Sequence, residues 1–159
     1  MGMTWVGYRH DPHTARACLL DDGLFEELLD SDDGESSVDL DKAWHGLHWL
    51  LTGSADETDS VLSQAILGGE PIGEDLGYGP GRLLPAAQVS LVADALTKLD
   101  VDTLRARMDG PAMSNAAVYP SIWDEDDVFE EYLIPAFNDL RHFYEQASGA
   151  GQAVIQTIC

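Results

Sequence analysis

The chain is poor in basic residues. It has 8 Lys and Arg against 29 Asp and Glu, which gives a formal net charge of −21 over 159 residues. Nucleic-acid binding depends on clustered Lys and Arg that contact phosphates, so this composition argues against DNA or RNA as a partner. The same shortage of cations disfavours docking on anionic lipid headgroups.

Cysteine, long apolar runs and targeting signals are also scarce. The two cysteines, Cys18 and Cys159, match no spacing rule for a disulfide, so a bridge between them stays open and a reduced protein is the default. No apolar run approaches the roughly 20 residues that a membrane helix needs. The N-terminus lacks the basic and apolar regions of a signal peptide. These absences predict a cytoplasmic protein that does not enter a membrane.

What is present favours a folded domain. Hydrophobic residues make up 45% of the chain, and four Trp, five Tyr and four Phe argue against global disorder. One domain over residues 1–159 is expected at this length. The predicted strands are 3–9 and 154–158, and the predicted helices are 13–20, 22–30, 40–51, 58–67, one from Pro85, 102–108 and one from about Asp124.

Several boundaries and loops are predicted as well. Asp39 is expected to cap the helix 40–51, and Pro135 should kink or divide the last helix. The segment 68–82, with six of the fifteen glycines, is predicted to be a shaped loop or a set of short turns, and 111–122 to be irregular. The fold class is therefore α+β: a single compact, mostly helical domain with a small sheet that pairs the N- and C-terminal strands.

Histidines give the clearest candidates for chemistry. His45 and His48 are three residues apart and can share a helix face with Asp41 one turn earlier, an arrangement that could hold zinc. The alternative is structural: one histidine bonds Asp41 or a loop carbonyl while the other lies at the rim of the core. His10 and His13 form a second pair at the same spacing, and it matches no metal motif.

A small-molecule site is the second possibility. It would combine Lys42, His45, Tyr78, Arg82 and Tyr119, drawn from a helix start and from nearby loops. His45 would act as acid or base, Arg82 as an anion anchor and Tyr78 as a donor. Arg82 is the only Lys or Arg between Lys42 and Lys98, and in so acidic a chain an internal carboxylate is its favoured partner.

Known catalytic motifs are missing. The glycine-rich segment has neither the P-loop nor the Rossmann spacing, and no Gly-x-Ser-x-Gly elbow occurs. We therefore predict no catalytic residue, cofactor or metal, and favour a non-enzymatic protein while the question of an enzyme stays open.

Several stretches together resemble one family. They are Met1–Met3 with the strand that follows, Leu40–Gly53 with its Asp-Lys-Ala-Trp-His run, Ile66–Gly69, Gly77–Arg82, Tyr119–Pro120 and Phe143–Tyr144. They are similar to the YfbM-like family, bacterial domains of unknown function. The resemblance spans nearly the whole chain and implies a single small α+β domain in a bacterial cytoplasm. It implies no activity, cofactor or catalytic residue.

The distribution of charge points to a binding role. Residues 21–41 contain ten acids and no base, and residues 124–131 contain six more acids. Acids suit the start of a helix, which accounts for part of the second cluster. The first cluster could attract a basic protein, such as a nuclease toxin bound in the manner of an immunity protein. Alternatively, its acids only keep the surface solvated. The oligomeric state stays open.

Overall fold

The structure is a computed structural model that describes residues 2–159, so Met1 of the Met1–Met3 stretch lies outside the described residues. The chain forms one α+β domain in which helices hold 49% of the residues. In chain order the elements are β1 (Trp5–His10), α1 (Pro12–Ala17), α2 (Asp22–Asp30), β2 (Ser37–Asp41), α3 (Trp44–Thr52), α4 (Val61–Leu67), β3 (Glu70–Asp75), β4 (Pro80–Leu84), α5 (Ala86–Thr97), α6 (Val101–Arg107), α7 (Gly110–Asn115), the π-helical turn η1 (Phe129–Leu133), α8 (Ile134–Gly149) and β5 (Ala153–Ile158).

A five-stranded antiparallel sheet runs through the middle of the domain, in the order β2-β1-β5-β4-β3. β1 and β5 pair from Trp5 opposite Ile158 to His10 opposite Ala153. Thr4 and Cys159 extend the ladder by exchanging main-chain hydrogen bonds of 2.8 and 3.0 Å. The predicted pairing of the first and last strands is confirmed. The sheet is larger than expected because three further strands join it.

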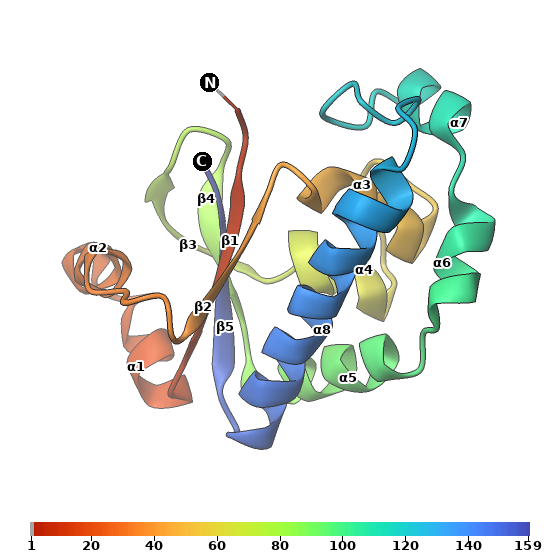
Figure 1. The fold of residues 1–159 in the computed structure, drawn as a ribbon. Helices are drawn as coiled ribbons and strands as arrows, with labels where there is room; N and C mark the ends of the chain where they lie inside the picture. The colour runs from red at the N-terminus through yellow and green to blue at the C-terminus, as the bar shows by residue number, and fades with distance from the viewer. Residues whose placement is uncertain (1) are drawn as a thin grey trace.

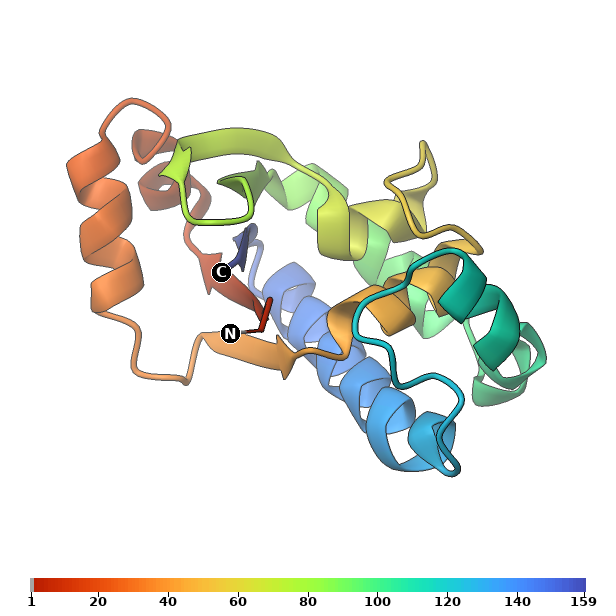
Figure 2. The same cartoon turned by 90° about the horizontal axis from the view of Figure 1, so that it is seen from above.

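Helices cover both faces of this sheet. Figure 1 shows α1 and α2 on one side and the helices from α3 to α8 on the other, and Figure 2 shows the same separation from above. Successive side chains of β5 point to opposite faces of the sheet, so this strand contacts both helical layers. Ile155 packs with Phe25 of α2 in the smaller apolar cluster, whereas Val154 belongs to the larger cluster under α3 to α8. No helix in the described part of the chain is long and apolar enough to cross a membrane.

The smaller layer is held close to the sheet by capped helices and small residues. Asp11 accepts a hydrogen bond from the main-chain N–H of Thr14 at 3.1 Å, and Asp21 caps α2 in the same way. The Phe25 ring lies against β3 and β4, where a Cβ added to Gly81 would stand 2.7 Å from its Cζ. Glycine at this position therefore lets α2 approach the hairpin.

The start of the helix predicted at 40–51 is instead the end of a strand and a turn. Residues Ser37–Asp41 form β2, and the helix α3 begins only at Trp44. Leu40 is buried while its neighbours Asp39 and Asp41 are exposed, which is the two-residue period of a strand at a sheet edge. Asp39 therefore does not cap a helix. Its carboxylate accepts from the N–H of Asp41 at 2.7 Å.

Two segments predicted as irregular carry regular structure. Most of the glycine-rich segment is the hairpin of β3 and β4, and its glycines gather at the turn, where Gly77 and Gly79 have φ of +121° and +100°. The carboxylate of Asp75 accepts from both of their N–H groups, at 2.6 and 3.2 Å. Helix α7 occupies part of the segment 111–122, because Asp109 supplies an N-cap and Pro111 lies in the first turn.

The last helix begins later than predicted. The four acids at 124–127 lie in turns. Helical structure starts with η1 at Phe129 and continues as α8 from Ile134. Pro135 is the second residue of α8 and directly follows the π-helical turn, so its missing N–H lies where the helical bonding changes. The backbone is helical on both sides of this junction, so the predicted kink or division takes the form of a change from π- to α-helical bonding immediately before the proline.

Candidate functional site

His45 lies in the first turn of α3 and connects three parts of the chain. Its Nδ1 accepts from the main-chain N–H of Tyr119 at 2.8 Å, and its Nε2 lies 2.7 Å from the carbonyl oxygen of Ala55. The N–H of Tyr119 can only donate, so Nε2 must carry the proton that is donated to Ala55. The ring also stacks on Trp44, with centroids 4.7 Å apart. Both ring nitrogens are therefore occupied.

His48 lies one turn further along α3 and is completely buried. Its Nε2 lies 2.8 Å from the carbonyl oxygen of Asp56, while its Nδ1 has no partner among the described residues. Burial lowers the pKa of His48, and this effect exceeds the opposite one of the Asp56 carbonyl. Both histidines are thus hydrogen-bonded to loop carbonyls. The structural interpretation of the sequence expected this for one histidine, with a loop carbonyl or Asp41 as its partner. It placed the other histidine at the rim of the core.

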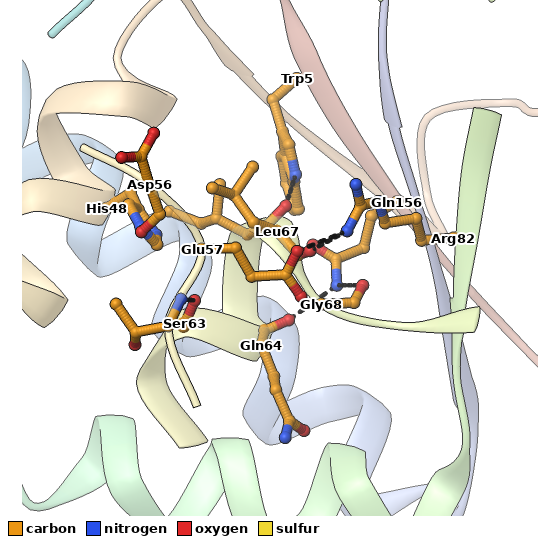
Figure 3. A network of polar contacts seen from close by, with 12 residues as sticks. Trp5, His48, Asp56, Glu57, Ser63, Gln64, Leu67, Gly68, Arg82 and Gln156 are labelled. Atoms are coloured by element: carbon orange, nitrogen blue, oxygen red, sulfur yellow. Dashed lines mark hydrogen bonds and ion pairs between the residues drawn. The ribbon is translucent and has the colours of Figure 1, made fainter. Parts of the chain in front are cut away.

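Arg82 holds the same loop from the other side. It projects from β4, and its Nη1 donates to the carboxylate of Glu57 at 3.0 Å and to the carbonyl of Leu67 at 2.5 Å. Its ion-pair partner is thus an internal acid, as the composition favours. Figure 3 shows His48 and Arg82 reaching the segment Asp56–Glu57 from different elements. Together His45, His48 and Arg82 anchor the consecutive residues 55–57 between α3 and α4.

Lys42 and Tyr119 lie near His45 and meet the start of the chain. The hydroxyl of Tyr119 accepts from the N–H of Met3 at 3.1 Å, and the indole N–H of Trp44 donates to the Met3 carbonyl at 3.0 Å. A Cβ added to Gly2 would collide with the side chain of Lys42 and stand 2.8 Å from the Tyr119 hydroxyl. Lys42, His45 and Tyr119 therefore form one group around residues 2–3.

Tyr78 and Arg82 form a second group. Tyr78 lies at the tip of the hairpin between β3 and β4, with 51% of its surface exposed. The two side chains line one small cavity together with Gln156 of β5. Lys42, His45 and Tyr119 do not line that cavity. The five residues of the predicted small-molecule site therefore lie in two groups, and His45 and Arg82 both contact the loop of residues 55–57.

The remaining histidines and cysteines lie around α1. His10, at the end of β1, has a buried Nε2 without a partner, and burial lowers its pKa. His13 is exposed on α1. Cys18 is buried, which raises the pKa of its thiol, and neither it nor the exposed Cys159 is bonded to another cysteine. Over residues 2–159 no three His, Cys, Asp or Glu side chains gather as a metal site would require.

Gln156 is a polar residue that the sequence interpretation missed. It is 2% exposed, in the middle of β5, and its amide N–H groups donate to the carbonyls of Gln64 and Gly68 at 2.7 and 2.9 Å. The strand 153–158 is otherwise strongly apolar up to this residue. A long amide on the inward-facing side of such a strand is the signal that could have identified it.

Known proteins share the fold and the sequence pattern of this chain. No curated protein matches the chain. The structure of a protein of unknown function, YfbM from Escherichia coli, is similar over 99% of this chain and 100% of that one, with a TM-score of 0.75 and 20% sequence identity. The likeness to YfbM supports the fold. A family profile described as a domain of unknown function, DUF1877, matches residues 1–157. The chain, which combines this fold with a match over nearly its full length, belongs to the DUF1877 family.

Proposed function

We propose that this protein is a non-enzymatic binding protein of the bacterial cytoplasm, whose acidic segment, residues 21–41, engages a basic protein in an immunity-like manner. This segment comprises α2, the loop after it and the edge strand β2 (Figure 1). Nine of its ten acids are exposed, and Asp32 is partly buried. The two ion pairs found among the described residues, Arg82–Glu57 and Arg105–Glu130, involve none of them. Among the described residues, the carboxylates of this segment therefore form no ion pair.

The observation that carries the proposal is the position of Leu20. This side chain is 93% exposed and immediately precedes the acidic segment. It borders a surface hollow of about 400 Å³ that is also lined by Leu19, Ala17 and Arg16. Protein interfaces commonly combine a buried apolar anchor with a polar rim. An exposed leucine beside uncompensated acids fits a partner that presents an apolar side chain among cations.

Local structure accounts for some of the acids. Asp21 caps α2, Asp33 accepts from the N–H of Glu35, and Asp39 accepts from the N–H of Asp41. Glu26, Glu27 and Asp30, on the exposed side of α2, make no side-chain hydrogen bond in the described chain. These three can be neutralised without removing a recorded contact, so they are the residues on which to test binding.

The test is a pull-down from native bacterial lysate with the triple variant Glu26→Gln, Glu27→Gln, Asp30→Asn. Its matched control, Glu125→Gln, Asp126→Asn, Glu131→Gln, removes the same charge from exposed acids of the second cluster. We expect the wild type and the control to retain a basic protein at 0.05 M salt. The α2 variant should lose it, and so should all three proteins at 1 M salt, where the screening length falls to about 3 Å.

A second variant, Leu20→Ser, tests the apolar anchor separately. It should weaken capture of the same basic protein by at least about tenfold, because anchors that insert into a pocket dominate interface energies. Recovery of the same proteins by the wild type and the α2 variant, or of no basic protein at low salt, would refute the proposal.

The alternative, a small-molecule-binding protein or enzyme around His45 and Arg82, receives less support from the geometry. The two nitrogens of His45 are both engaged by main-chain groups, and Arg82 is paired with Glu57. His45 therefore has no unengaged ring nitrogen for an acid or base role, and the charge of Arg82 is already balanced by Glu57.

A further inference from the structure

The chain contains Asp-Gly steps at 22–23, 33–34 and 109–110. The main-chain nitrogen that follows an aspartate can attack the side-chain carboxyl group of that aspartate. Glycine favours this reaction because it has no side chain that would keep its nitrogen away from the carboxyl group, and because its backbone turns freely. Regular structure opposes the reaction wherever it fixes the two residues. The surroundings of the three steps therefore determine which of them reacts.

The step at 33–34 lies outside regular structure. Helix α2 ends at Asp30 and β2 begins at Ser37, and Figure 2 shows the connection between them at the outer side of the domain. Asp33 and Gly34 are both exposed. A Cβ added to Gly34 would meet nothing within 4 Å, and glycine adopts its φ of +84° at no steric cost. No packed group therefore opposes a change of backbone conformation at this step.

The carboxyl group of Asp33 is already turned toward the peptide that follows it. Its Oδ1 accepts from the main-chain N–H of Glu35 at 2.9 Å, and this Asx turn folds the side chain back over the peptide between Asp33 and Gly34. The N–H of Gly34 has no hydrogen-bond partner among the described residues. The attacking nitrogen is thus unengaged, and the carbon that it attacks lies over the same peptide.

The step at 22–23 is held in a helix. It forms the first two residues of α2, and the carboxylate of Asp21 caps this turn by accepting from the N–H of Leu24 at 3.2 Å. The carbonyl of Asp21 also accepts from the N–H of Phe25, a buried residue, at 3.2 Å. Turning the nitrogen of Gly23 toward the Asp22 carboxyl group would unwind this turn, so the capped helix protects the step.

The step at 109–110 is held by a cap and by packing. The carboxylate of Asp109 accepts from the N–H of Ala112 at 3.0 Å and caps α7. A Cβ added to Gly110 would stand 2.5 Å from the carbonyl oxygen of Trp123, so the main chain at this step lies directly against another segment. Rearrangement here would have to break the cap and separate the two segments.

We propose that Asp33 is a site of spontaneous isoaspartate formation. The nitrogen of Gly34 forms a bond to Cγ of Asp33, and its proton leaves with the hydroxyl of the carboxyl group as water. The product is a cyclic imide (a succinimide). Water then opens the ring at Cγ, which restores aspartate, or at the main-chain carbonyl of Asp33, which leaves the chain linked through Cγ. Isoaspartate has one more CH₂ group in the main chain and the same negative charge. The reaction does not depend on whether the acidic segment binds a partner.

The test compares the three steps within one protein. The full chain is kept at physiological pH and temperature, and samples are cut after glutamate, which places each Asp-Gly step in a different peptide. Electron-transfer fragmentation then distinguishes isoaspartate from aspartate, which has the same mass. We expect isoaspartate to accumulate at Asp33 at least about tenfold faster than at Asp22 or Asp109, because exposed loops open more readily than capped helix turns. A comparable rate at either helical step, or no reaction at Asp33, would overturn the proposal.

The same chain unfolded in guanidinium chloride separates the effect of structure from that of sequence. Without α2 and α7, the three steps should react at rates within about threefold of one another, because glycine follows the aspartate in each. A preference for Asp33 that persists unchanged in the unfolded chain would mean that its sequence neighbours select the site. That result would refute the structural argument.

Two variants locate the reaction without changing the charge. In Asp33→Glu the longer side chain would have to close a larger and less favourable ring. Most of the isoaspartate detected by methyl transfer from a protein isoaspartate methyltransferase should therefore disappear. The matched control Asp22→Glu makes the same change in another exposed Asp-Gly step and should leave the methyl transfer at the wild-type level. An equal loss in both variants, or no loss in Asp33→Glu, would contradict the assignment to Asp33.

Discussion

Lowering the pH should destabilise this protein through His48. Its side chain is fully buried, its Nε2 is held by the Asp56 carbonyl, and its Nδ1 has no partner. Protonation would place a charge and an unsatisfied N–H inside the core. Burial is the main cause of its lowered pKa, and His45 lowers it further, whereas the Asp56 carbonyl and the acids Asp56 and Glu57 act in the opposite direction.

The sign and size of the effect follow from proton linkage. In the unfolded chain a histidine has a pKa of about 6.5, and in the folded protein that of His48 is lower. Between these two values the unfolded state binds one more proton than the folded state. The stability contributed by neutral His48 is thus complete above about pH 6.5 and is lost as the pH falls toward the folded-state pKa. The slope approaches about 1.4 kcal/mol per pH unit within that window.

The assay is urea unfolding of the wild type and of His48→Gln at intervals from pH 7.5 to pH 5. The Nε2 of glutamine can still donate to the Asp56 carbonyl, but the side chain does not titrate. His10, whose pKa burial also lowers, is present in both proteins and cancels in the difference. The wild type should lose stability faster than the variant as the pH falls. Parallel curves, or an NMR titration that gives His48 a pKa of 6.5 or above, would refute this reasoning.

Two further predictions concern the core. Tyr144→Phe removes the hydroxyl that donates to the Ala65 carbonyl at 2.8 Å in a fully buried position, so it should lower the free energy of unfolding by about 1–3 kcal/mol in urea titrations. A loss below a few tenths would mean that water reaches the Ala65 carbonyl. Gly46→Ala would drive a methyl group into the Trp123 ring, so it should lower the free energy of unfolding by about 1–3 kcal/mol and shift the Trp fluorescence. An unchanged melting temperature would contradict the packing of α3 against Trp123.

Local patterns were sufficient for much of the fold. The β-branched and aromatic residues at 4–8 and 154–158 predicted the strands that pair as β1 and β5. The helix 22–30 has the predicted bounds. The prediction of a helix from residue 40 was wrong, because Leu40 fits a helical stripe and an alternating strand equally well. Only the pairing of β2 with β1 decides between the two.

The partners of the candidate residues were less predictable. Composition favoured an internal acid for Arg82, but the choice of Glu57 depends on where α4 places the loop 53–60. The three-residue spacing of His45 and His48 indicated that the two side chains could share a helix face, and both contact the loop after α3. That they bond adjacent carbonyls, at Ala55 and Asp56, is a tertiary fact with no local signature. Gln156 shows the same limit, because its two carbonyl partners lie more than 85 residues away.

The strand order has a consequence for biosynthesis. Of the five strands, β5 is the last to be synthesised, yet it is the middle strand of the sheet. Until it emerges, β2 with β1 and β3 with β4 can exist only as two separate pairs of strands, and an isolated pair of strands is marginally stable. The nascent chain must therefore carry both halves of its sheet unjoined until β5 emerges, and the insertion of this one strand closes them into one structure.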